Sequence, residues 1–180
     1  MGGHGMDALH LVPLRPGMEQ AVAAYRAEFP AGRPQVTCDP ERIPGLDRLE
    51  DFASVKDWLN WCGSMAGKVS WFMAVRESDS AAVGCLCLRH KPEYDDDDPE
   101  FCSHIGYSVR PSERGKGYGK EQLRLGLQEA RALGLTKVRL VCRDMNAASR
   151  RVILKNGGTY IDTIHGEESG MNVERYDITL

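Results

Sequence analysis

No stretch of this 180-residue sequence stays apolar over the roughly 18 residues that a membrane-spanning helix needs. The start, Met1 to Met6, also lacks the apolar segment of a secretory signal peptide. We therefore expect no membrane partner and a cytoplasmic location. A second methionine at position 6 indicates that residues 1–6 are a tag or a disordered start.

A strong excess of charge of one sign is missing as well. The net charge is -3, with 42% hydrophobic and 27% charged residues, which is typical of an ordinary soluble globular protein. A broadly cationic nucleic-acid binder is therefore not expected. The length fits one domain, over residues 7–180, and no internal repeat divides it.

The six cysteines form no C-x-x-C pair, and most lie inside apolar stretches. Free, buried thiols are the simplest interpretation, as in a reducing compartment. Cys85 and Cys87 would point to one face of a strand, but no second pair of ligands follows them. The sequence therefore predicts no metal site.

Hydrophobic periodicity predicts the order β-α-α-β-β-β-α-β-α-β-β. This order predicts an α/β (α+β) fold, with a mixed, mostly antiparallel central sheet of about six or seven strands and helices on both faces. Trp58 and Trp61 lie on one face of the second helix, which favours a role in the core. The expected strands are 7–15, 69–76, 81–90, 101–110, 137–143, 159–165 and 173–180, and the expected helices are 17–29, 52–65, 115–133 and 147–156.

The most informative segment is a glycine-rich turn between a strand and the third helix. Gly115, Gly117 and Gly119 alternate with other residues, which lets the backbone come close to a ligand. The exposed N–H groups of a helix N-terminus bind anions. Nearby cationic side chains add to this, so the turn is suited to a phosphate or pyrophosphate; they are Arg114, Lys116 and Lys120.

Two common phosphate motifs do not fit this turn. Gly115 and Gly119 are one residue too close for the pattern G-x-x-x-x-G-K-[ST], and Glu121 stands where its hydroxyl should be. Lys120 replaces the third glycine of G-x-G-x-x-G. A turn that binds no ligand remains the alternative.

The run Arg114-x-x-Gly117-x-Gly119 resembles the Arg/Gln-x-x-Gly-x-Gly/Ala signature of the GCN5-related N-acetyltransferase (GNAT) family. The likeness extends to the preceding strand, to Asn146-Ala-Ala-Ser149 and to Lys155-Asn-Gly-Gly, and is greatest to a bacterial "predicted acetyltransferase" branch. It implies an acyl-CoA N-acyltransferase that moves an acetyl group from acetyl-CoA directly to a primary amine of a small or peptidic acceptor.

The resemblance also implies a binding site. The backbone of the turn would hold the pyrophosphate, the strand before it would pair with the pantetheine amides, and the next helix would contact the far arm of the cofactor. Asn146 could equally be a helix N-cap, and both roles stay open. The implied residues are Tyr107, Ser108 and Val109 on the strand, Arg114, Gly115, Lys116, Gly117, Tyr118, Gly119 and Lys120 in the turn, and Asn146, Ser149 and Lys155.

The sequence departs from the family at one catalytic position. The family often places a tyrosine that acts as general acid seven residues after the asparagine that corresponds to Asn146. In this sequence Ile153 stands at that position. Candidate bases are Glu100 and His104, on or just before the expected strand, although His104 could also be a packed or surface histidine. Deprotonation through water, without a dedicated base, is a further alternative.

The segment 93–100 carries six acidic residues. Such a run is usually a solvated loop, but it could also attract a cationic acceptor.

We expect a monomer or a homodimer. Two rival functions remain, a CoA-binding sensor or regulator without catalysis and an acetyltransferase for an amine on a macromolecule.

Overall fold

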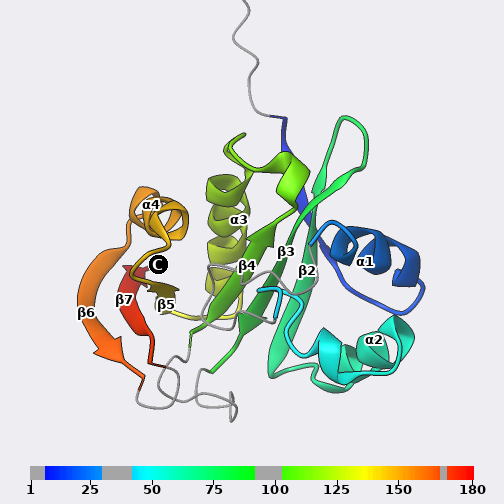
Figure 1. Cartoon of the computed structure of the whole chain (residues 1–180), viewed down its shortest axis with the longest axis horizontal. Helices are drawn as coiled ribbons and strands as arrows, with labels where there is room; N and C mark the ends of the chain where they lie inside the picture. The colour runs from blue at the N-terminus through cyan, green and yellow to red at the C-terminus, as the bar shows by residue number, and fades with distance from the viewer. Residues whose placement is uncertain (1–6, 30–41, 92–102, 167–169) are drawn as a thin grey trace, which may run out of the picture.

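The computed structural model describes residues 7–29, 42–91, 103–166 and 170–180 (Figure 1). The candidate base Glu100, the acidic run 93–100, Cys38 and Cys102 lie outside these residues. No described helix has the length and apolar character that crossing a membrane requires.

Seven described strands form two hydrogen-bonded sheets in which every pairing is antiparallel. The first has the order β1-β2-β3-β4 and the second the order β5-β7-β6. The strands are β1 (Leu9–Pro13), β2 (Val69–Arg76), β3 (Ala82–Arg89), β4 (Ile105–Val109), β5 (Lys137–Arg143), β6 (Thr159–His165) and β7 (Asn172–Thr179).

Within the described residues, four α-helices connect the strands in the order that the sequence predicts. The observed elements are shorter than expected by a few residues at most ends, where turns and caps take over. The helices are α1 (Glu19–Arg26), α2 (Val55–Ser64), α3 (Tyr118–Ala132) and α4 (Ala147–Lys155), with 3-10 turns at Leu49–Asp51 and Pro111–Glu113.

Helices cover both faces of the first sheet, as predicted. On one face, Trp58 of α2 packs in a core with Cys85 and Cys87 of β3. On the other, Leu123 of α3 packs in a core with Leu86. Alternation along β3 sends successive side chains into these two cores. The cysteines of the described segments are free and buried, as expected; they are Cys62, Cys85, Cys87 and Cys142.

Glycines on both elements, Gly84 of β3 and Gly126 of α3, leave room for the side chains that pack between α3 and β3. A Cβ at Gly126 would come within 2.6 Å of a Leu86 methyl carbon, and one at Gly84 within 2.1 Å of the Gln122 amide oxygen. Gln122 is fully buried, and its amide nitrogen donates to the Cys85 carbonyl at 2.6 Å. This contact fixes the first half of α3 against β3.

The expected central sheet is divided between β4 and β5. The two strands meet where the His104 N–H donates to the Arg139 carbonyl at 2.9 Å. Beyond that point the described residues form no ladder between them. In the view of Figure 1, α3 appears between the two sheets. This separation leaves one edge of β4 without a strand partner, next to the glycine-rich turn.

Candidate functional site

The glycine-rich turn enters α3 through left-handed backbone. Gly115 has φ of 78° and Gly117, the N-cap of α3, has φ of 91°. These conformations favour glycine and explain two of the three glycines. Gly119 is required by packing, since a Cβ there would lie 3.4 Å from Val152 of α4 and 3.5 Å from Val109.

The backbone N–H groups of Gly115 to Gly119 find no hydrogen-bond acceptor within the described part of the chain. Gly117 offers no side-chain cap to the first turn of α3. Free N–H groups and the positive end of the helix dipole act on the same point in space. This local geometry can bind an anion, and the anion site stays a prediction.

A charged network anchors the turn to the first sheet. Arg76, at the end of β2, donates through Nη1 to Glu113 at 3.0 Å and to the Tyr118 hydroxyl at 3.2 Å. Tyr118 is only 5% exposed and packs against Leu9 and Val83. The Tyr118 side chain is thus an anchor in the core, and only its backbone N–H can face a ligand.

The cationic charge of the turn is partly neutralised, which the sequence did not predict. Lys116 donates to Glu113 at 2.9 Å. This hydrogen bond, together with Arg76, keeps the pKa of Glu113 below its ordinary value despite some desolvation. Arg114 donates from Nε to the Val109 carbonyl at 3.1 Å and thereby fixes the loop to the end of β4.

The free edge of β4 presents Tyr107 and Val109. The Arg110 N–H donates to Val83 of the neighbouring chain segment at 2.9 Å. Backbone groups alternate between the two edges of a strand, so Ser108 faces β3 while Tyr107 and Val109 face away from it. Ser108 is buried, and its carbonyl accepts from the Tyr25 hydroxyl at 3.0 Å. Ser108 therefore stays a prediction as a cofactor contact, while its backbone in this structure faces β3.

The Tyr107 side chain bridges β4 and the start of α4. Its hydroxyl lies 3.0 Å from the Ser149 Oγ, and its ring packs on the core that contains Cys142 of β5. Burial raises the pKa of Tyr107 above its ordinary value, although the hydrogen bond with Ser149 acts in the opposite direction. The phenol is therefore protonated at neutral pH. Sequence spacing gave no signal for this contact.

Asn146 is the N-cap of α4, since its Oδ1 accepts the Ser149 N–H at 3.1 Å. This confirms the structural role that the sequence left open for it. The other end of α4 is tied to α3, where Asn156 donates to the Lys120 carbonyl at 3.2 Å. Both helices that border the site are thus fixed relative to each other.

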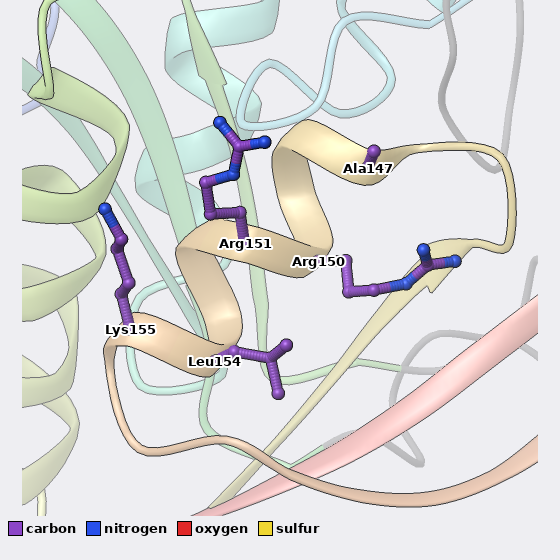
Figure 2. A pocket seen from close by; sticks show the side chains of 5 residues that line it. All are labelled: Ala147, Arg150, Arg151, Leu154 and Lys155. Atoms are coloured by element: carbon purple, nitrogen blue, oxygen red, sulfur yellow. The ribbon is translucent and has the colours of Figure 1, made fainter.

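A shallow hollow lies along α4 and is lined by Ala147, Arg150, Arg151, Leu154 and Lys155 (Figure 2). Figure 2 shows Arg151 and Lys155 projecting from one side of the helix and Arg150 from the other. Arg150 is bound to Glu174 at 2.7 Å. Arg151 was missed by sequence reasoning, although its i, i+4 spacing to Lys155 places the two cations on one face.

Two of the catalytic positions considered from the sequence, Ile153 and His104, lie within the described residues, and Glu100 does not. Ile153 is fully buried in the core under α3 and α4. His104 lies where β4 meets β5, and its Nδ1 accepts the Arg139 N–H at 2.9 Å. The ring nitrogen that accepts this bond is not available to a substrate proton while the bond lasts.

Comparisons with known proteins agree with this geometry. A family model described as an acetyltransferase (GNAT) domain matches residues 12–159. The RimL ribosomal L7/L12 alpha-N-protein acetyltransferase, solved with coenzyme A, is 15% identical with a TM-score of 0.73, over 98% of this chain and 96% of that chain.

Two further solved structures have the same fold. The acetyl transferase that modifies the N-terminal serine of ribosomal protein L7/L12 from Salmonella typhimurium is 16% identical with a TM-score of 0.71, covering 98% of this chain and 96% of that one. Spermidine N-acetyltransferase from Vibrio cholerae is 15% identical with a TM-score of 0.66, covering 95% and 93%. A comparison with curated proteins gives no match.

The chain belongs to the GNAT acetyltransferase family, because the family model spans most of its length. This confirms the predicted family, the α/β fold and the enzyme class, an N-acetyltransferase.

Proposed function

We propose that the protein moves an acetyl group from acetyl-CoA directly to the primary amine of a small or peptidic acceptor. The observation that carries the proposal is the row of unpaired N–H groups at Gly115 to Gly119, next to the free edge of β4. An anion site beside an open strand edge suits a ligand with a pyrophosphate followed by an amide-containing arm.

Each part of acetyl-CoA would meet a different group of this chain. The turn would hold the pyrophosphate. The outward backbone groups of Tyr107 and the N–H of Val109, whose carbonyl already accepts from Arg114, would pair with the pantetheine amides as an added strand. Lys155 and Arg151, on one side of α4, would meet the phosphate of the far arm. Bound acetyl-CoA supplies the activated acetyl group as a thioester.

The transfer needs a neutral amine, a stabilised oxyanion and a leaving thiolate. An outward N–H of β4 would donate to the thioester carbonyl, where loss of one donor can cost about 100-fold or more in rate. Glu100 and His104 stay predictions as bases, and proton loss through water is the alternative. A thiol of pKa about 8.5 leaves without full protonation at neutral pH.

The solved relatives support an amine as the acceptor class. One acts on the N-terminal serine of a ribosomal protein and another on spermidine. Both acceptors carry primary amines, so the panel for this protein should contain a serine-initiated peptide and a polyamine. A non-catalytic CoA sensor is the other outcome of such a test.

The experiment measures free thiol released from acetyl-CoA with each amine and identifies the acetylated product by mass spectrometry. Gly117→Glu puts bulk and negative charge at the anion site and should abolish release. Gly134→Glu is the matched control, since Gly134 lies at the opposite end of α3 with a similar φ of 83°. CoA binding without acetylation of any amine would make the protein a sensor and overturn the proposal.

A further inference from the structure

We propose that Arg143 binds a carboxylate on the acceptor, so that this enzyme acetylates amines that also carry a carboxylate group. The inference rests on the proposed function, because it names the class of acceptor for the same acetyl transfer. It favours amino acids and short peptides over polyamines, which have no carboxylate for Arg143 to bind.

Three arginines lie on one face of the second sheet, and two of them are paired with carboxylates. Arg139 of β5 donates to both oxygens of Asp177, at 2.8 and 3.0 Å. Arg175 of β7, which faces β5 between the other two arginines in the register, donates to both oxygens of Asp162. The third arginine of this face is Arg143, at the end of β5.

Arg143 has no such partner. Within the described part of the chain its side chain makes no hydrogen bond or ion pair, and its Nε is buried without an acceptor. A buried donor in this state has lost its hydration and gained no bond in return. Val173, which faces Arg143 in the register, is fully buried. An anion that reached this guanidinium would therefore bind where little water screens the charges.

Arg143 lies on the side of the two sheets that faces away from α3. On β5, Leu140 and Cys142 pack in one core with Leu123 of α3. Successive side chains of a strand alternate between its faces, so Arg143 projects from the opposite face. The same core contains Leu86 of the first sheet, so the face away from α3 continues from the second sheet to the first.

An acceptor would reach the thioester from the side of Arg143. The turn before α3 and the cationic side chains of α4, which the proposed function assigns to the cofactor, belong to the elements that pack on the other side. Gly106 of β4 faces Cys87 in the register and lies on the side of Arg143, where it adds no side chain between β4 and β5. Arg143 lies about 13 Å along β5 from Arg139, where the strands meet, so its long side chain can reach an acceptor bound between them.

A carboxylate is the anion that fits this position best. The planar guanidinium binds a carboxylate through two parallel hydrogen bonds, a geometry that a lysine cannot reproduce. Arg139 and Arg175 bind carboxylates in this way on the same face. A carboxylate of the acceptor would thus complete the third pair of the row. The contact is not covalent, and the carboxylate leaves unchanged on the acetylated product.

The test measures kcat/KM for α- and ω-amino acids of increasing chain length, each compared with its own carboxamide. Arg143→Gln should lower the ratio of acid to amide by about 10- to 100-fold, the effect of hydrogen bonds between charged groups, mainly through a higher KM for the acid. Arg143→Lys should keep part of the ratio, since it keeps the charge. Arg175→Gln, the same substitution on the same face, should leave the ratio unchanged. Comparing proteins cancels the different amine pKa of acid and amide.

An acid-to-amide ratio that Arg143→Gln leaves unchanged would overturn the inference and leave the proposed function standing. Wild-type protein that acetylates polyamines or amides but no amino acid would have the same consequence. Wild-type protein that acetylates no amine would overturn the proposed function, and the inference with it. Thermal unfolding and the Kd for CoA should be unchanged in Arg143→Gln, because the side chain has no partner in the described part of the chain to lose.

Discussion

His104 and Arg139 join the two sheets by a reciprocal pair of contacts. The His104 N–H donates to the Arg139 carbonyl at 2.9 Å, and the Arg139 N–H donates to His104 Nδ1 at 2.9 Å. The imidazole thus replaces the carbonyl that a regular ladder would supply. The contact closes the sheet at one end, and β4 and β5 diverge from it towards α3 and α4.

Two substitutions of His104 distinguish a structural role for this histidine from a catalytic one. His104→Asn should keep stability and kcat, because the Asn oxygen can take the place of Nδ1 as acceptor. His104→Ala should lower the free energy of unfolding by about 1–3 kcal/mol, because the partly buried Arg139 N–H loses its partner. Urea unfolding and steady-state kinetics measure both. A stable Asn variant with kcat reduced 100-fold or more would identify His104 as the base.

The network around Arg76 predicts an effect on cofactor affinity from outside the binding site. Arg76→Gln removes the charge that holds Glu113 and the Tyr118 hydroxyl. Glu113 would then be neutralised by Lys116 alone and would repel a pyrophosphate more strongly, so the Kd for CoA should rise several-fold, about the effect of one charge pair. Calorimetric titration measures it. Arg175→Gln, which breaks an ion pair with Asp162 on the second sheet, should leave the Kd unchanged.

Ile153 is predicted to act through packing alone. It is fully buried between α4 and the second sheet, and a Cβ at Gly158 would lie 2.5 Å from it. Ile153→Ala should lower the free energy of unfolding by about 2–5 kcal/mol. The single-turnover rate of the folded fraction should stay within about twofold of wild type. A large rate loss without destabilisation would show that this position takes part in the chemistry.

Low pH should reduce the contribution of the second sheet to the stability of the fold. Arg139 donates to both oxygens of Asp177, with Lys137 close by, and these contacts hold the pKa of Asp177 below its usual value. The ionised carboxylate thus stabilises the fold above its unfolded pKa of about 4, and this contribution is lost as the pH falls through the lower folded pKa.

Asp177→Asn should therefore be less stable than wild type at pH 7, by about 1 kcal/mol for a partly exposed ion pair. The difference should shrink towards about pH 2, where both proteins lack the charge. Thermal unfolding across this range measures it. A gap between the two proteins that stays constant with pH would contradict the assignment of the lowered pKa to Asp177.

The sequence predicted the order of elements and the glycine-rich turn before α3 because both depend on local patterns. Alternation in β2 and β3, helical spacing around Trp58, and the glycines at 115 and 117 are readable within a few residues. The N-cap role of Asn146 can also be predicted from local sequence, since its partner Ser149 is three residues away.

Contacts between distant residues could not be read in this way. Tyr107 meets Ser149 across 42 residues, and Arg76 meets Tyr118 across the same separation. The division of the sheet at His104 and the orientation of Ser108 towards β3 depend on register, which pattern alone does not set. These contacts determine which of the predicted site residues face the free edge of β4.

Hydrogen exchange with and without CoA tests the central claim most directly, because it reports the individual backbone amides that should hold the cofactor. We predict strong new protection of the amides of Gly115 to Gly119 and of the outward amides of Tyr107 and Val109, well above any change in β6. Protection confined to other segments, or no change at saturating CoA, would contradict the account.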